Sequence, residues 1–117
     1  MNEHMKDLLK NLKVIDLSTV LAGPSVGTFF AELGADVIKI ESPHQGDVTR
    51  SWKVPNEDPK AQVSAYFSCV NFKKQYTQLN LAEQRDYKIF LKHVENADIL
   101  ISNFKKGDDQ KLNIEDH

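Results

Sequence analysis

Two kinds of group in the sequence are suited to binding an anion: the start of a predicted helix and two pairs of lysines. The Gly-Pro-Ser turn at residues 23–25 precedes a segment with helical periodicity. The first turn of a helix presents unpaired backbone N–H groups at its positive dipole end. The basic doublets are Lys73 with Lys74 and Lys105 with Lys106, and the second falls where it can neutralise phosphate. Spacing alone leaves open the alternative that all four lysines are solvated surface residues.

The sequence contains no recognisable catalytic constellation. The turn at residues 23–25 lacks the spaced glycines of GxGxxG, and nothing matches GxxxxGK[ST], which argues against a nicotinamide or ATP site. Neither a Ser/His/Asp arrangement nor paired carboxylates are visible. The histidines lack the spacing of metal ligands: His4, His44, His93 and His117. We expect Asp47 and Arg50 to pair with each other. Trp52 either stacks on a base or, as we favour, covers the core.

These groups must be positioned by alternating strand-like and helix-like segments. Short apolar runs predict strands over residues 13–17, 36–40 and 99–101, and a weakly alternating, β-prone segment predicts another over residues 76–79. Helix-period segments between them are typical of βαβ units and a mainly parallel sheet. The loops after the first, second and fourth strands then gather at the carboxyl edge of the sheet, where open α/β sheets bind ligands. We therefore predict an α/β, Rossmann-like fold with flanking helices.

Two longer helices are predicted from apolar residues that recur at i, i+3, i+4 and i+7. The first follows Pro24 and ends at Gly34. Its expected packing face consists of Val26, Phe29, Phe30 and Leu33. The second begins at Asn80, because Asn80 and Glu83 form a capping-box pattern, and it ends near Asn96. Its expected packing face consists of Tyr87, Phe90, Leu91 and Val94.

A long segment separates the second and third strands. Residues 41–62 contain three prolines and Gly46 among charged residues, which predicts a loop with little regular structure. A loop of this length within a compact domain is usually functional or disordered. Residues 65–70 are apolar again, and both helix and strand remain open for them.

The composition limits the possible functions. A chain of 117 residues with 40% hydrophobic and 27% charged residues suits one globular domain. The net charge of -2 provides no basic field for nucleic acid or an anionic membrane. Cys69 is the single cysteine, so we expect a small buried thiol in a cytoplasmic protein. No apolar run approaches about 18 residues, so no membrane-spanning helix is predicted.

The segments that define this fold also carry a family pattern. It starts with residues 12–17, Ala-Gly-Pro-Ser at 22–25, and Phe-Ala-Glu-Leu-Gly-Ala-Asp-Val-Ile-Lys-Ile-Glu at 30–41. It continues with Gly-Asp-Val-Thr-Arg at 46–50, Tyr66-Phe67, Asn71, Leu79-Asn80, and Ala-Asp-Ile-Leu-Ile-Ser-Asn-Phe at 97–104. In this order and at this spacing the segments resemble the opening of the class III CoA-transferases. That family includes formyl-CoA:oxalate and carnitine-type CoA-transferases, with the α-methylacyl-CoA racemases as relatives.

The resemblance implies that the N-terminal Rossmann-like domain binds coenzyme A at the sheet edge described above. Carried over position by position, the expected coenzyme contacts are Leu21, Ala22, Ser42, Lys74, Leu79, Asn80, Asn103, Phe104, Lys105 and Lys111. Ser42 stands where some members carry arginine. Lys74-Gln75 replaces a Lys-Arg pair, and Lys105-Lys106-Gly107 replaces a basic-Pro-Gly sequence. Positive charge is kept at these positions, but the bidentate guanidinium geometry is lost.

The resemblance also implies a reaction, and a group that this chain lacks for it. Family members run to several hundred residues, form interlocked dimers and use an aspartate nucleophile that proceeds through a mixed anhydride and an aspartyl-CoA thioester. None of the aspartates here falls at the matching position. We therefore expect residues 1–117 to be the truncated, N-terminal coenzyme A-binding part of an acyl-CoA:carboxylate CoA-transferase, inactive alone and without a metal cofactor.

Two alternatives stay open beside this interpretation. The chain is a non-catalytic remnant or interaction module that keeps the fold, which the departures at Ser42 and Lys106 favour slightly. Otherwise it is an unrelated dinucleotide-binding oxidoreductase domain, which the missing glycine fingerprint disfavours. The expected partners are coenzyme A or acyl-CoA, a separately encoded C-terminal half, or a second copy that pairs along the apolar strand at residues 99–101. Nucleic acid and membranes are not expected partners.

Overall fold

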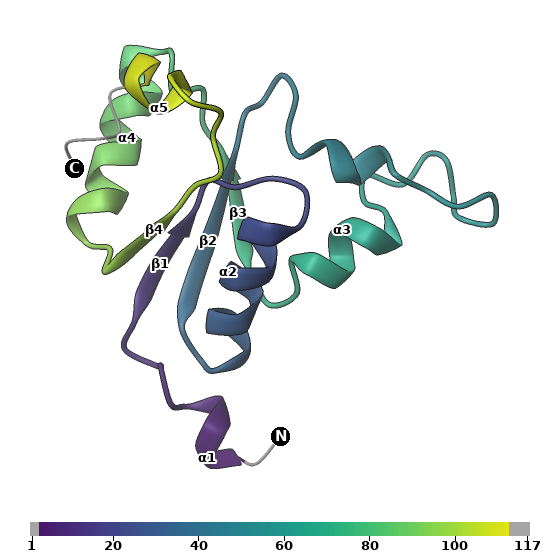
Figure 1. Ribbon diagram of the computed structural model, residues 1–117, viewed down its shortest axis with the longest axis horizontal. Coiled ribbons are helices and arrows are strands. Elements are labelled where there is room, and N and C mark those ends of the chain that lie inside the picture. The colour runs from purple at the N-terminus through teal and green to yellow at the C-terminus, as the bar shows by residue number, and fades with distance from the viewer. Residues whose placement is uncertain (1–2, 113–117) are drawn as a thin grey trace.

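The computed structural model describes residues 3–112 as a four-stranded sheet with helices on both faces (Figure 1). The elements in chain order are α1 (Glu3–Lys6), β1 (Lys13–Asp16), α2 (Ala22–Glu32), β2 (Asp36–Glu41), the 3₁₀ turn η1 (Val48–Ser51), α3 (Ala65–Val70), β3 (Gln75–Gln78), α4 (Gln84–Glu95), β4 (Ile99–Ile101) and α5 (Asp108–Lys111). His117, one of the histidines considered above, lies outside the described residues.

The four strands run parallel in the order β3-β2-β1-β4. Val14 in β1 is paired with Val37 in β2 and with Ile99 in β4, and Ile40 in β2 is paired with Thr77 in β3. This order is that of the first half of a doubly wound sheet. The predicted α/β fold is confirmed, and each strand lies within one residue of its predicted bounds.

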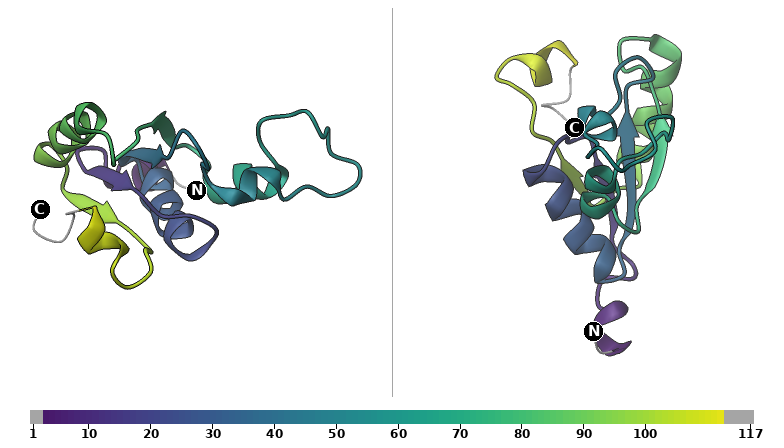
Figure 2. Two further views of the ribbon diagram at one scale, coloured as in Figure 1. Left: turned by 90° about the horizontal axis from the view of Figure 1, so that it is seen from above. Right: turned by 90° about the vertical axis from the view of Figure 1, so that its right-hand side faces the viewer.

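The central strands place different chemistry on the two faces of the sheet, because successive side chains in a strand point to opposite sides. On the α4 side, Ile15, Ile40 and Phe90 belong to one apolar cluster. On the α2 side, Val14 and Val37 form a second cluster with alanines of α2 and the turn after it. Figure 2 shows α2 and α4 on opposite sides of the sheet. Both faces of β1 and β2 are therefore covered.

Helix α2 packs on the sheet through small residues, which corrects the predicted face. Gly23, Gly27 and Ala31 are buried, whereas Val26 and Phe29 are 47% and 58% exposed. A Cβ atom at Gly27 would lie 2.9 Å from the Asp16 carboxylate, so the helix approaches the sheet too closely for a larger residue. The apolar periodicity identified two outward-facing residues because it cannot register a face made of glycines.

Helix α4 starts later than the capping-box pattern predicts. Asn80 does not cap the helix; its side chain accepts a hydrogen bond from Ala82 N–H at 3.1 Å, which forms a turn, and the helix begins at Gln84. The predicted apolar face is confirmed, since Phe90 is fully buried and Tyr87, Leu91 and Val94 pack around it. The five residues between β3 and the helix thus remain available as a loop at the sheet edge.

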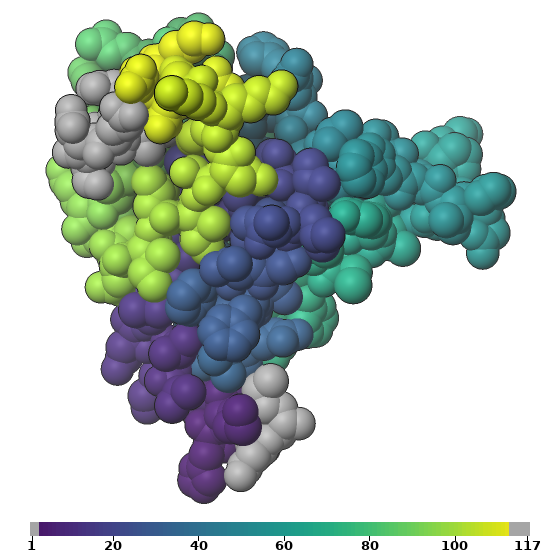
Figure 3. All heavy atoms as spheres, viewed as in Figure 1, coloured from purple at the N-terminus to yellow at the C-terminus, as the bar shows by residue number. Residues whose placement is uncertain are grey.

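The predicted long loop follows β2 and is irregular apart from η1. Its outer part projects from the body of the protein (Figure 3). Residues 65–70, left open above, form α3, whose first turn is capped by Ser64. Cys69 on α3 is exposed rather than buried. Trp52 is 45% exposed and contacts the edge of Tyr66, so it does not close over the core.

Candidate functional site

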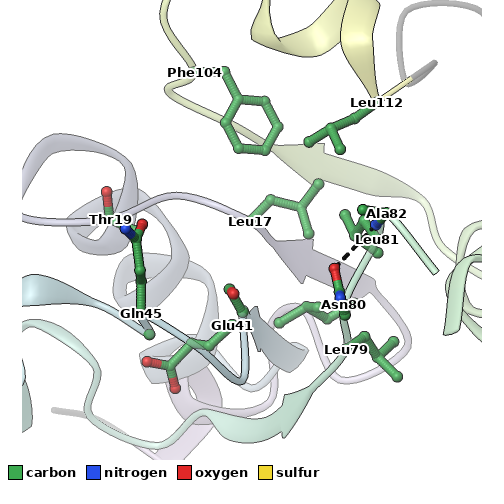
Figure 4. A pocket seen from close by; sticks show the side chains of 13 residues that line it. Leu17, Thr19, Glu41, Gln45, Leu79, Asn80, Leu81, Ala82, Phe104 and Leu112 are labelled. Carbon is green, nitrogen blue, oxygen red and sulfur yellow. Dashed lines mark hydrogen bonds between the residues drawn. The ribbon is translucent and has the colours of Figure 1, made fainter.

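A pocket of about 310 Å³ opens at the carboxyl ends of the strands (Figure 4). All four strand-following segments contribute to it, as expected where the ends of parallel strands meet. The lining residues are Leu17, Thr19, Ile40, Glu41, Ser42, Gln45, Gly46, Leu79, Asn80, Leu81, Ala82, Phe104 and Leu112. One site is therefore built from four parts of the chain that are distant in sequence.

The pocket combines an apolar floor with a polar rim. Leu17 and Leu79 are buried and belong to the core cluster beneath it. Phe104 stands across the opening from Leu17 in Figure 4, and it is partly buried against the same cluster. Asn80 and Gln45 supply amide groups at the rim. Such a lining suits a flat heterocycle with hydrogen-bonding edges, because the ring faces bury apolar surface while the edges find polar partners.

The structure brings four of the predicted coenzyme contacts together in this pocket: Ser42, Leu79, Asn80 and Phe104. Leu21 and Ala22 lie outside the pocket lining, at the exposed start of α2. The remaining predicted residues are Asn103, Lys105, Lys111 and Lys74, none of which lines the pocket.

Asn103 and the two lysines after it lie in the exposed segment that follows β4. The Asn103 side chain makes two hydrogen bonds to Thr19: its Oδ1 accepts from Thr19 N–H at 3.1 Å, and its Nδ2 donates to Thr19 O at 2.7 Å. Lys105 is exposed. Lys111 is exposed and lies 3.5 Å from the Asp108 carboxylate in an i,i+3 pair. These lysines can move toward a ligand because little holds them in place.

Lys74 is placed inside the protein, away from the pocket. Its ammonium group lies 2.7 Å from the Asp16 carboxylate, and both side chains are fully buried. It also donates to Pro24 O at 2.7 Å and to Asn71 Oδ1 at 2.9 Å. Burial lowers the pKa of Lys74, against the opposing effect of Asp16. This lysine is neither a solvated surface residue nor a group that the structure brings to the candidate site.

Two more ion pairs lie beneath the loops at the same end of the sheet. Asp47 and Arg50, expected to pair with each other, have different partners: Asp47 Oδ2 lies 2.9 Å from Lys39 Nζ, and Arg50 holds both carboxylate oxygens of Glu41 at 2.9 and 2.6 Å. The Arg50 guanidinium also stacks 3.8 Å above the Phe67 ring. Both pairs attach the long loop to β2.

The electrostatics of these pairs keep the buried carboxylates ionised. Burial alone would raise the pKa of Asp47, but hydrogen bonds from Lys39 and Thr49 outweigh it and hold the pKa below its usual value. Burial would also raise the pKa of Glu41, but the hydrogen bonds from Arg50 and Asp47 N–H, with the charges of Arg50 and Lys39, together lower it. The hydrogen bonds of Glu41 raise the pKa of Arg50 in turn. Charges matched in this way are consistent with a fixed framework under the site.

Several lining residues were not identified from the sequence: Leu17, Thr19, Ile40, Glu41, Gln45, Gly46, Leu81, Ala82 and Leu112. Thr19 lies only three residues past the end of β1, and residues 45–46 follow β2 in the long loop, which was expected to be functional or disordered. Their position directly after predicted strands is the feature of the sequence that could have identified them as lining residues. Leu81 and Ala82 were assigned to a helix that in fact begins beyond them.

The parallel sheet, with a pocket at the carboxyl ends of its strands, defines an α/β protein of the doubly wound type. The sequence matches the family described as CoA-transferase family III over residues 9–117. Because this match covers most of the chain, the protein belongs to that family.

Individual relatives agree with this assignment. The chain is 42% identical over 106 residues to a succinyl-CoA:mesaconate CoA-transferase from Haloarcula marismortui, covering 89% of this chain and 26% of the relative. It is 46% identical over 96 residues to an acetyl-CoA:oxalate CoA-transferase from Acetobacter aceti, covering 82% of this chain and 24% of the relative. The chain therefore spans about a quarter of the length of these relatives.

Solved structures give the same result for the fold. A CAIB/BAIF family protein from Brucella suis has a TM-score of 0.77 at 38% identity, with 89% of this chain and 28% of that chain covered. A protein from Mycobacterium tuberculosis has a TM-score of 0.81 at 28% identity, with 92% and 29% covered. Within residues 3–112, no helix is long and apolar enough to cross a membrane.

Proposed function

We propose that this chain supplies the coenzyme A-binding part of an acyl-CoA:carboxylate CoA-transferase, with residues 1–117 forming the N-terminal portion of the larger domain. The observation that carries the proposal is that predicted coenzyme contacts from separate loops meet in one place. Ser42, Leu79, Asn80 and Phe104 come from three different loops, and all four line one pocket at the carboxyl edge of the sheet. Membership of the family gives this pocket its expected ligand.

The pocket supports a particular placement of the coenzyme. Its volume and apolar floor suit the adenine ring between Phe104 and Leu79. A second hollow of about 550 Å³ shares Thr19, Gln45 and Gly46 with the first, so the two hollows offer a continuous path for the pantetheine arm. Lys105 and the exposed start of α2 supply positive charge and N–H groups for the phosphates.

Three aspartates of the described residues are poorly suited to be the nucleophile. Asp16 and Asp47 are fully buried and paired with lysines. Asp98 lies at the amino-terminal edge of the sheet, where it accepts a hydrogen bond from Lys13 N–H. We propose that the attacking aspartate is provided by polypeptide outside residues 3–112, and that the present chain binds acyl-CoA without transferring it.

Calorimetric titration with coenzyme A tests the binding proposal, with ADP as a competitor for the nucleotide end. Phe104→Ala should weaken binding on the order of tenfold, since stacking of a base on an aromatic ring contributes about 1–3 kcal/mol. Phe72→Ala is the matched control, because Phe72 is exposed and does not line the pocket. Absence of binding at millimolar coenzyme A would refute the proposal, and preferential binding of NAD would revive the oxidoreductase alternative.

A turnover assay tests the second half of the proposal. The substrates named for the relatives are available for this purpose: acetyl-CoA with oxalate, or succinyl-CoA with mesaconate. We expect this chain alone to bind the thioester and to form no new thioester. Sustained transfer by the isolated chain would show that one of its own carboxylates is the nucleophile.

A further inference from the structure

The loop between β1 and α2 adopts a conformation that its sequence does not favour. Val20 has φ of 74°, in the left-handed region. For a β-branched residue this is a rare and costly conformation, which persists only where the surrounding structure enforces it. Its neighbour Thr19 lines both hollows described above, and α2 begins at Ala22, two residues after Val20. The strained residue thus lies between a pocket-lining residue and the start of the helix.

Side chains from three other elements hold this loop in place. Lys39 of β2 donates to Ser18 O at 2.7 Å. Asn103, after β4, pairs with both backbone groups of Thr19. Asp47, in the long loop, accepts a hydrogen bond from Val20 N–H at 3.3 Å. The backbone conformation is therefore imposed by contacts that are remote in sequence.

Asp47 connects these contacts to one another. Its Oδ2 lies 2.9 Å from the Lys39 ammonium, while its Oδ1 accepts from Thr49 as well as from Val20. Its own N–H donates to Glu41 at 2.9 Å. The side chains of Asp47 and Lys39 are fully buried, although Asp47 is among the residues that line the second hollow. Their side-chain atoms are directed to the loop and to each other, so we expect them to contribute to binding through the loop.

We infer that Asp47 and Lys39 are positioning residues of the coenzyme site: they hold Val20 in the left-handed conformation and thereby place Thr19 and the start of α2 against the ligand. This inference rests on the proposed function, because the ligand is coenzyme A. A residue that only supports the fold would lower stability without depending on the conformation of Val20. A positioning residue has an additional signature, since glycine adopts the left-handed conformation at no steric cost.

The test compares Asp47→Asn with the double variant Asp47→Asn/Val20→Gly in full-length protein, measuring coenzyme A affinity by calorimetry and protection of the Val20 amide by hydrogen exchange. Asp47→Asn should weaken binding about tenfold and reduce amide protection in the loop. Adding Val20→Gly should recover most of the affinity. Val37→Ala, in the core at the other end of the same sheet face, should lower the melting temperature and leave the affinity unchanged.

A second route covers the case in which Asp47→Asn does not fold. Asn103→Ala releases Thr19 from an exposed position, and Val20→Gly should restore binding in that background if the lost contact acted through the loop. Failure of Val20→Gly to restore binding in a folded variant overturns the inference, as does an unchanged affinity for Asp47→Asn. If the unmodified protein does not bind coenzyme A, the proposed function itself is overturned. That outcome is distinguishable from the two above, because in those the unmodified protein binds and only the variants report on the loop.

Discussion

Replacing Lys74 with methionine should destabilise this protein severely. The Lys74 ammonium is the partner of the buried Asp16 carboxylate at 2.7 Å and also donates to the oxygens of Pro24 and Asn71. Methionine fills a similar volume but leaves these acceptors unpaired in the interior. Removing one member of a buried ion pair costs about 3–5 kcal/mol, a large share of the roughly 5–15 kcal/mol that stabilises a domain.

Thermal and urea denaturation followed by far-ultraviolet circular dichroism measure this loss. For a chain of this size, about 4 °C of melting temperature accompanies each kcal/mol, so the expected decrease is about 12–20 °C. The matched control is Lys73→Met, one residue earlier. Lys73 is exposed, and its replacement should change the free energy of unfolding by less than about 0.5 kcal/mol.

The double variant Lys74→Met/Asp16→Asn separates the interaction between the two charges from the contribution of each side chain alone. It removes both charges, so it should lose less stability than the sum of the two single variants. Equal and small effects of Lys73→Met and Lys74→Met would refute the reasoning, because they would mean that Lys74 is solvated. In that case its predicted role as a direct coenzyme contact would regain support.

Two other expectations concern solution behaviour. The pKa values of Glu41 and Asp47 lie below their usual 4.5 and 3.8. The ionised carboxylates therefore stabilise the folded protein fully above those values, and this stabilisation is lost as the pH falls through the lower native pKa. Urea titrations at several pH values should show the free energy of unfolding decreasing below about pH 4.5, and less steeply in Glu41→Gln. In the described residues β4 pairs only with β1 and leaves its outer edge unpaired, so we expect the isolated chain to self-associate, and light scattering that gives a monomer at high concentration would contradict this.

The strands and their parallel arrangement were predictable because β1, β2 and β4 are short, largely apolar runs, while β3 could be recognised only by its weakly alternating, β-prone residues. Val14, Ile15, Val37 and Ile40 are buried on one face or the other, as a sheet covered on both sides requires. The carboxyl edge as the candidate ligand site also follows from this arrangement. Ser42, Leu79, Asn80 and Phe104 were found through the family resemblance, and the pocket places them together.

The parts that could not be predicted depend on close approach between distant segments. Asp16 and Lys74 are 58 residues apart, and nothing local indicates that they pair. The same is true of Lys39, a charged residue within an apolar strand whose partner lies in an irregular loop. Gly27 explains the error at α2, since the helix lies against this charged surface through a residue that has no side chain.

The Asn103 hydrogen bonds to Thr19 join positions that are 84 residues apart. During synthesis the β1–α2 loop leaves the ribosome long before Asn103 does, so it lacks this restraint until β4 has docked beside β1. Contacts of such long range are slow to form, because the chain must order everything between them first. We therefore expect the pocket to acquire its final shape among the last events of folding. A nascent chain stopped before residue 103 should contain most of the sheet and bind the nucleotide poorly.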